Sequence, residues 1–310
     1  MDKGVKDKIK GTIFGHAIGD SLGLPLEGWS KEGIKQYYPD GYSFYNQMER
    51  MGWEQGEWTD DTEQMLCIMD SIIERGDVDI KDIAGKIYKW SEGGGKGIGM
   101  TVANVIYFPG FLDDPYSAAR EIWERSGCYL APNGGVMRTS VLGIWKYWNE
   151  KEVIKNAEDI CRITHWDPRC IGSCVAVCYA ISSFLKGVNE PISIYKDVLK
   201  LVDNYDKRIK PYLELAKEPI SEIKLDEKGS MGYTLKTLAA GFWAVLNGRD
   251  FKGGLLTIVN EGGDTDTNGS VSGALLGARF GYSNIPHEYI RGLVKNDILE
   301  RKVDLFIEKM

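Results

Sequence analysis

Apolar residues recur every three or four positions along most of the 310-residue chain, and this spacing restricts the folds available to it. The spacing gathers apolar side chains on one face of an α-helix, whereas a half-buried strand needs strict alternation, which is nearly absent here. We therefore predict an all-α fold, formed by one compact domain over residues 1–310. Apolar helical segments are predicted at 65–73, 80–90, 117–123, 136–148, 153–163, 172–185, 192–215, 233–246 and 273–280.

Loops rich in Gly, Asp and Asn separate these segments, and each loop runs into an apolar helical stretch. They are SEGGGKGIG at 91–99, APNGG at 131–135 and NEGGDTDTNG at 260–269. Functional side chains are concentrated on loops that a rigid scaffold positions. We therefore expect the chemistry of this protein on loops at the N-termini of helices.

Charge and hydropathy limit the partners of the chain. Its net charge of −7 disfavours nucleic acid, because it repels phosphate backbones. Residues 1–19 carry scattered charges and lack the unbroken apolar core of a signal peptide, so we expect a cytoplasmic protein. The longest apolar stretch, 171–185, falls short of the roughly 18 to 20 residues that span a bilayer. We expect a buried core helix there and no membrane partner, and the oligomeric state stays open.

Three of the six cysteines recur every four residues, which places them on one stripe of that helix: Cys170, Cys174 and Cys178. A zinc site prefers four soft ligands, with partners from a second segment. We favour small buried packing residues over a metal site.

Thr59, Asp60 and Asp61 precede a helix that we expect to begin near Thr62. Asp60 and Glu63 have the spacing of a capping box, so they can simply satisfy the first N–H groups of the helix. Alternatively, the two adjacent carboxylates repel each other until a bound cation relieves the repulsion. The spacing alone does not decide between these two interpretations.

A second acidic block, formed by Asp264, Asp266 and Thr267, precedes a helix expected to begin near Ser270. Capping is again an alternative. However, the Asp-x-Asp spacing directs both carboxylates to one side of an extended loop. Two Asp pairs, each with a Thr hydroxyl, supply the hard oxygen ligands that Mg²⁺ and Mn²⁺ prefer. Together the two blocks favour a site for two metal ions.

Weaker signals come from two further acidic residues. We expect Asp20 to be a structural cap or turn former. Glu27 follows Pro25 in a segment that cannot be regular helix, so its carboxylate can point into a site.

Glycine loops offer backbone N–H groups that bind phosphate oxygens where a loop opens a helix. The candidates are the loop 93–99 and the run Asn133, Gly134 and Gly135, to which Arg138 can add a bidentate contact. Ordinary turn formation is the alternative for each loop. His165 precedes Pro168 and either orients a ligand hydroxyl or serves as a capping or packing histidine.

In this order, these blocks resemble the ADP-ribosylglycohydrolase family, which includes the glycohydrolase that reactivates dinitrogenase reductase and the ADP-ribosyl-acceptor hydrolases. The resemblance covers nearly the whole chain, and the paired T-D-D and G-G-D-x-D-T blocks are highly specific. The matching segments are GTIFGHAIGDSLGLPLEGW, WTDDTEQ, GKGIGMTVANV, NGGVMRTSVLGIW, ITHWDPRCI, GYTLKTLAAGFWAVL and GGDTDTNGSVSGALLGARFG. The chain departs from the family pattern at His16 and Thr265, where small residues are usual.

The resemblance implies an all-α fold with a binuclear Mg²⁺ or Mn²⁺ centre at the bottom of an ADP-ribose cleft. It places the metal ligands at Glu27, Thr59, Asp60, Asp61, Asp264, Asp266 and Thr267. It places the ligand-binding residues at Gly95, Lys96, Gly97, Ile98, Gly99, Asn133, Gly134, Gly135 and His165, with the diphosphate on the 95–99 loop.

The implied reaction is hydrolysis of the glycosidic bond that links ADP-ribose to a protein side chain, through a transition state with oxocarbenium character. Glu27 and one of the pair Asp60 and Asp61 are the candidates for proton transfer. We favour arginine as the modified residue, and serine-linked ADP-ribose and small ADP-ribosyl esters remain alternatives. A further alternative is a silent member of the fold that binds ADP-ribose or serves a structural role.

Two other classes of helical metal-dependent phosphohydrolase are alternatives. The histidine-aspartate class needs a His-Asp dipeptide, which none of the three histidines forms. The all-α pyrophosphatase class needs acidic pairs on helices. Glu54 with Glu57 and Glu74 with Asp77 have the spacing, but each pair encloses a glycine, which disfavours helix.

Overall fold

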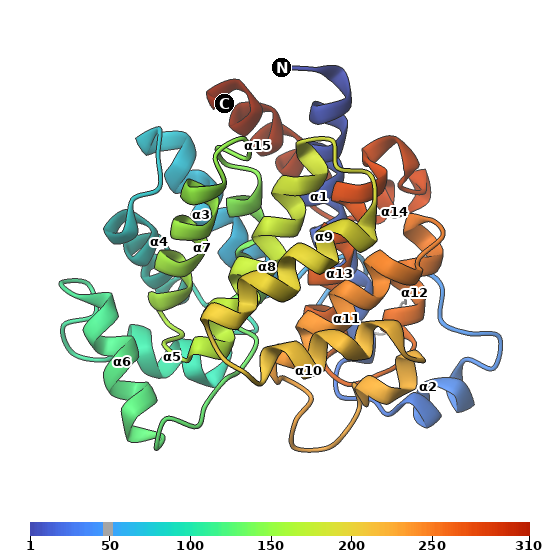
Figure 1. Ribbon diagram of the computed structural model, residues 1–310, viewed down its shortest axis with the longest axis horizontal. Helices are drawn as coiled ribbons and strands as arrows, with labels where there is room; N and C mark the ends of the chain where they lie inside the picture. The colour runs from blue at the N-terminus through green and yellow to red at the C-terminus, as the bar shows by residue number, and fades with distance from the viewer. Residues whose placement is uncertain (46–51) are drawn as a thin grey trace.

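The computed structural model describes residues 1–45 and 52–310, and its regular structure is helical throughout these ranges (Figure 1). No strand forms within them, and only two isolated bridges pair extended residues. The prediction of an all-α fold is therefore confirmed. The α-helices are α1 (Lys3–Gly23), α2 (Lys31–Tyr37), α3 (Asp60–Arg75), α4 (Ile80–Glu92), α5 (Met100–Ile106), α6 (Pro115–Arg125), α7 (Glu150–Arg162), α8 (Pro168–Leu185), α9 (Pro191–Leu201), α10 (Ile209–Glu214), α11 (Thr234–Asn247), α12 (Phe251–Val259), α13 (Thr265–Phe280), α14 (His287–Gly292) and α15 (Asn296–Lys309).

Short 3-10 helices connect or extend several of these elements. They are η1 (Leu24–Leu26), η2 (Val136–Arg138), η3 (Ser140–Gly143), η4 (Val202–Asn204), η5 (Leu215–Lys217), η6 (Ile220–Ile223) and η7 (Tyr282–Asn284).

Helices α1 and α13 lie backbone against backbone in the middle of the molecule (Figure 1). Glycines every fourth residue make this approach possible. A Cβ added to Gly15 would lie 2.2 Å from the carbonyl oxygen of Gly273, and one added to Gly19 would lie 1.9 Å from that of Gly269. Because Gly11 faces Gly277 while Gly23 faces Thr265, the two helices run antiparallel. This arrangement brings the end of α1 to the start of α13.

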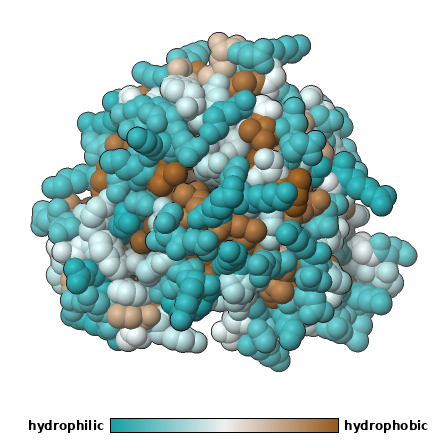
Figure 2. Space-filling view, in the orientation of Figure 1, coloured by the Kyte–Doolittle hydropathy of each residue, from teal (hydrophilic) through white to brown (hydrophobic). Residues whose placement is uncertain are grey.

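Helix α8 crosses the core, as expected for its apolar segment. It begins at Pro168, so its 18 residues are long and apolar enough to span a membrane by length and composition, but 89% of them are buried inside the protein. Its cysteines Cys170, Cys174 and Cys178 are buried free thiols, in agreement with a packing role. On the face shown in Figure 2, hydrophilic side chains cover most of the surface and enclose small apolar patches.

Two predicted helices are wrong in detail. The segment 192–215 divides into α9, η4 and α10, because Pro211 has no N–H and its ring clashes with the carbonyl four residues before it. The segment 136–148 forms the two short helices η2 and η3 instead of one α-helix. There Gly143 packs so closely on α8 that an added Cβ would lie 2.7 Å from the carbonyl oxygen of Cys178. Propensity and periodicity do not reveal this tertiary contact.

Substitution of Gly15 by alanine tests the contact between α1 and α13. The added methyl group must push the two backbones apart, so we expect Gly15→Ala to lower the free energy of unfolding by about 1–3 kcal/mol or more. Gly85 in α4 is the matched control, because an added Cβ meets no atom within 4 Å there. Gly85→Ala should raise stability by roughly 0.5–1 kcal/mol. Equal effects of the two substitutions in urea unfolding would contradict the close helix contact.

Candidate active site

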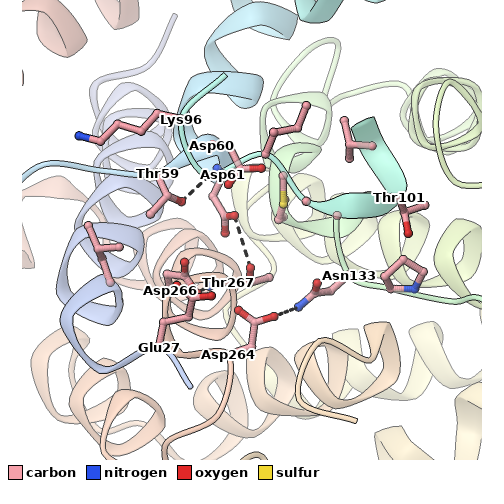
Figure 3. Close-up of a pocket in the computed structure, with 18 of the residues that line it drawn as sticks. Glu27, Thr59, Asp60, Asp61, Lys96, Thr101, Asn133, Asp264, Asp266 and Thr267 are labelled. Atoms are coloured by element: carbon pink, nitrogen blue, oxygen red, sulfur yellow. Dashed lines mark hydrogen bonds between the residues drawn. The ribbon is translucent and has the colours of Figure 1, made fainter. Parts of the chain in front are cut away.

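One cavity of about 590 Å³ contains every predicted metal ligand (Figure 3). The residues come from three regions far apart in the sequence: the end of α1, the start of α3 and the start of α13. Predicted metal ligands on its wall are Glu27, Thr59, Asp60, Asp61, Asp264, Asp266 and Thr267. The structure thus brings together the two acidic blocks, as the sequence predicts.

The start of α3 is capped by residues other than Asp60. Thr59 is the N-cap, and its hydroxyl accepts a hydrogen bond from the backbone N–H of Asp61 at 3.2 Å. Asp20, buried in the middle of the fold on α1, accepts the N–H of Thr59 at 3.0 Å and that of Thr62 at 3.1 Å. A helix is thus capped by a carboxylate from another helix. The prediction that Asp20 is a structural cap is confirmed.

The capping-box interpretation of Asp60 and Glu63 is wrong. Asp60 is the first residue of α3, and the carboxylate of Glu63 accepts the indole N–H of Trp58 at 2.9 Å. Because Thr59 and Asp20 satisfy the helix end, the carboxylates of Asp60 and Asp61 are available to the cavity.

The start of α13 differs from that of α3. Asp264 is the N-cap residue by position, but its side chain makes no capping hydrogen bond. Instead its carboxylate accepts the side-chain N–H of Asn133 at 2.9 Å (Figure 3). The helix begins at Thr265, five residues earlier than predicted, and the Thr265 hydroxyl donates to the carbonyl of Gly23 at 2.7 Å. This hydrogen bond fixes the end of α1 to the start of α13.

Glu27, Asp264 and Asp266 form the tightest acidic cluster, in which one carboxylate oxygen from each lies within 4.8 Å of the others. Across the cavity, Asp61 accepts the hydroxyl of Ser270 at 2.7 Å and that of Thr267 at 3.3 Å. The side-chain atoms that these residues can offer to a metal ion are all oxygens, and hard divalent cations bind oxygen ligands in proteins. The residues therefore fit a site for a hard divalent metal ion.

Burial and mutual repulsion oppose ionisation of these carboxylates. Burial is the largest cause that raises the pKa of Asp60, Asp61 and Asp266 well above the usual value of 3.8, and neighbouring carboxylates raise it further. Burial also raises the pKa of Asp20 to about 7. A bound cation would supply the missing counter-charge.

The opposite wall of the cavity is formed by the loop before α5. Lys96, Gly97, Ile98 and Gly99 line the cavity. Gly97 has a φ of +93°, and an added Cβ would lie 2.9 Å from Oδ1 of Asp60, so only glycine lets the loop approach the acidic cluster this closely.

The ammonium group of Lys96 points away from the acidic groups (Figure 3). It lies 2.9 Å from a carboxylate oxygen of Glu57 and 3.7 Å from the ring centroid of Trp53. Its contribution to the site is therefore to tie the loop to the segment before α3.

Two predicted ligand-binding glycines lie behind the cavity wall. Gly95 follows the end of α4, where an added Cβ would touch the backbone of Ser91, and Gly135 packs on the ring of His165 and on Cys161. By contrast, Asn133, Gly134 and His165 do line the cavity. Arg138, considered as a phosphate contact, is fully buried and absent from the wall. The acidic pair Glu54 and Glu57 lies outside any helix, which removes support for a pyrophosphatase arrangement.

Several residues that hold the site together have no predicted role from the sequence. Gln64 donates to Asp60 at 2.9 Å, Ser270 donates to Asp61, and Thr237 accepts from Asn133 at 3.0 Å. Gln64 follows Asp60 by one helical turn, which is a signal that helix periodicity supplies. No local pattern indicates Thr237, which lies more than a hundred residues from its partner.

Comparisons with known proteins identify a family and several relatives of this chain. The family model described as ADP-ribosylglycohydrolase matches residues 1–310. An uncharacterized protein of Archaeoglobus fulgidus is 30% identical, over 96% of this chain and 94% of its own. An ADP-ribosylarginine hydrolase, Tri1, of Serratia proteamaculans is 28% identical, over 94% of this chain and 76% of its own.

A solved structure titled "ADP-ribosylglycohydrolase-related protein complex" superimposes with a TM-score of 0.79 and 28% identity, and the match covers 100% of both chains. The shared fold, the full-length match and the two acidic blocks in one cavity lead to one conclusion: the chain belongs to the ADP-ribosylglycohydrolase family of enzymes, which hydrolyse ADP-ribosyl bonds.

Proposed function

We propose that this protein removes ADP-ribose from modified arginine side chains of proteins. The observation that carries the proposal is a single cavity in which buried carboxylates face a glycine loop. The acidic wall suits a sugar whose anomeric carbon gains positive charge in the transition state. Arginine as the acceptor is supported by the relative named ADP-ribosylarginine hydrolase.

We further propose that the acidic wall holds two Mg²⁺ or Mn²⁺ ions. Glu27, Asp264 and Asp266 would hold one end of this centre, and Thr59, Asp60, Asp61 and Thr267 would complete it. Bound there, such ions supply Lewis acidity toward ribose hydroxyl groups and water. The oxygen-only donor set and the unfavourable ionisation of the buried carboxylates support this assignment.

The chain's own carboxylates provide the proton transfers. Glu27 lies on the short segment after η1, where it joins the cluster with Asp264 and Asp266. Asp60 and Asp61 lie on the facing helix end. Carboxylates on both sides of a glycosidic bond match the acid and base roles of glycoside hydrolysis, and we assign these roles to Glu27 and to one of Asp60 and Asp61.

The diphosphate of ADP-ribose needs a polar surface to bind, and its base needs an aromatic one. We assign the diphosphate to the loop around Gly97 and Gly99, beside Asn133 and His165 on the cavity wall. A second cavity of about 690 Å³ adjoins the first at Pro132, and tyrosine rings and an arginine form part of its wall. Stacking on such rings suits a planar base, and the aromatic wall residues are Tyr129, Tyr212 and Tyr233.

Peptides that carry ADP-ribose on arginine, serine or cysteine test the function directly. With Mg²⁺ or Mn²⁺ present, we expect free ADP-ribose to be released from the arginine-linked peptide. Asp60→Asn is the matched control, since it removes one charge from the cavity and retains the side-chain shape. Release from the serine-linked peptide alone would contradict arginine as the acceptor. Absence of release from all three would contradict hydrolysis and favour a silent binding protein.

Metal dependence is tested by thermal unfolding in the presence and absence of a chelator. A metal ion that binds only the folded state at 100 times its Kd adds about 2.7 kcal/mol, so Mg²⁺ or Mn²⁺ should raise the melting temperature. Asp60→Asn and Asp266→Asn should each reduce that rise and abolish hydrolysis. The double variant should lose little more, because groups that act as one unit are not additive. Full activity in chelator, with additive losses in the variants, would exclude the binuclear centre.

The dependence of stability on pH provides an independent check on the metal-free protein. Burial raises the pKa of Asp20 from 3.8 to about 7 and moves Asp60, Asp61 and Asp266 in the same direction. The folded state therefore binds more protons than the unfolded state, so stability should fall as pH rises from 3.8 to about 7. Added Mg²⁺ should oppose this fall, because the ion replaces the protons. Stability that rises through this window in chelator would contradict the repulsion within the cluster.

A further inference from the structure

Arg138 is a fully buried cation with an unusual set of partners. It forms no ion pair with a carboxylate in the part of the chain that the structure describes. Instead, one end of its guanidinium donates to the side-chain oxygen of Gln64 at 2.6 Å, and the other end donates to the hydroxyl of Thr164 at 2.5 Å. The Nε atom of Arg138 has no partner among the described residues, so these two hydrogen bonds are the ones that compensate the buried charge, and they hold Gln64 and Thr164 in place.

The hydrogen bond from Arg138 limits the direction of the second hydrogen bond that the Thr164 hydroxyl forms. Arginine is always a donor, so the Thr164 oxygen accepts from it and its own hydrogen remains to be donated. The other contact of this oxygen is Nδ1 of His165 at 2.8 Å. The Thr164 hydroxyl has no other hydrogen-bond partner among the described residues, so its hydrogen goes to Nδ1, which is then the unprotonated nitrogen of the ring. In a neutral imidazole the proton then sits on Nε2.

His165 lies on the cavity wall, and its buried Nε2 atom has no hydrogen-bond partner among the described residues. The side chain is 3% exposed and lines the cavity, yet Nε2 forms no hydrogen bond. Gly134 packs against this edge of the ring, and only glycine leaves room beside Nε2, since an added Cβ would lie 3.0 Å from Nε2 and 2.9 Å from the neighbouring ring carbon. A buried donor without a partner costs roughly 1–3 kcal/mol. A ligand oxygen at this position would satisfy it.

We propose that Arg138 and Thr164 are positioning residues that hold His165 as the neutral tautomer protonated on Nε2, so that it donates a hydrogen bond to an anionic oxygen of the bound ligand. The identity of that oxygen, one of the diphosphate of ADP-ribose, rests on the function proposed above. His165 is thus a fixed donor and takes no part in proton transfer. Burial, aided by the charge of Arg138, lowers the pKa of His165 to about 3, which agrees with a neutral ring.

The same arginine also sets the orientation of a carboxylate in the acidic cluster. Because the Gln64 oxygen accepts from Arg138, its amide nitrogen must face the other way, and it donates to Oδ2 of Asp60 at 2.9 Å. The oxygen Oδ1 of Asp60 is on the side of the Gly97 loop. Arg138 therefore positions a group on each side of the cavity, Asp60 on the acidic wall and His165 on the ligand wall.

Nitrogen-15 NMR of the histidine rings measures the tautomer without any assay of activity. In the wild-type protein, we expect Nδ1 of His165 to show the shift of an unprotonated nitrogen and Nε2 that of a protonated one. Thr164→Val retains the shape of the side chain but removes the hydroxyl group, so it should yield a mixture of tautomers. The same variant should bind ADP-ribose about tenfold more weakly, the loss expected for one hydrogen bond to a charged oxygen. Thr164→Ser, which restores the hydroxyl, should recover both properties.

His16 provides an internal control in the same spectra. It is also buried, and its Nδ1 contacts the hydroxyl of Ser140 at 3.1 Å, but it does not line the cavity. Its signals should not change in Thr164→Val.

A wild-type spectrum with the proton on Nδ1 of His165 would overturn the proposal, even if every variant failed to fold. Unchanged tautomer and affinity in Thr164→Val would do the same. Wild-type protein with the expected tautomer but without affinity for ADP-ribose would refute the proposed ligand and leave the positioning of His165 by Arg138 intact.

Discussion

The backbone contact between α1 and α13 determines where the acidic groups of this protein lie. Helices that touch through glycines have almost no freedom to slide, because each turn of one fits directly on a turn of the other. The contact ends where Gly23 meets Thr265, and the predicted ligands follow at once: Glu27 after α1 and Asp266 within the first turn of α13. Asp20 on the same α1 then fixes the start of α3. A single helix thus sets the relative positions of both acidic blocks.

Much of the fold could be predicted from the sequence because the apolar spacing is strong and the turns are rich in glycine. The predictions that are wrong concern the local geometry of two helices. Pro211 lies in the first turn of α10 and prevents one α-helix from continuing through the residues before it, an effect that the sequence shows because it follows from the proline ring itself. The sequence does not show the 3-10 geometry around Gly143, since it depends on contact with α8. Periodicity reports which side chains are buried but does not report how closely two backbones approach.

The sequence predicts the acidic residues of the site for a sound physical reason, but it does not predict the residues that contact them. Two adjacent carboxylates at a helix start are costly unless something compensates them, and this cost is visible in the sequence. The groups that orient them are not visible there, because Asn133 and Thr237 reach the site from distant segments. Arg138 illustrates the opposite error. A cation beside a glycine pair suggested direct contact with a phosphate, whereas the side chain is buried behind the wall.

Both α3 and α13 begin at the cavity, and this shared orientation has an electrostatic consequence. The aligned peptide dipoles of a helix place roughly half an elementary positive charge at its N-terminus. Asp60, Asp61 and Asp266 all lie in first turns, so they occupy the positions where a negative side chain is most favoured. The two helix ends therefore offset part of the cost of removing these carboxylates from water. The same field attracts anions, so a ligand that carries a diphosphate experiences a favourable backbone potential even beside a strongly acidic wall.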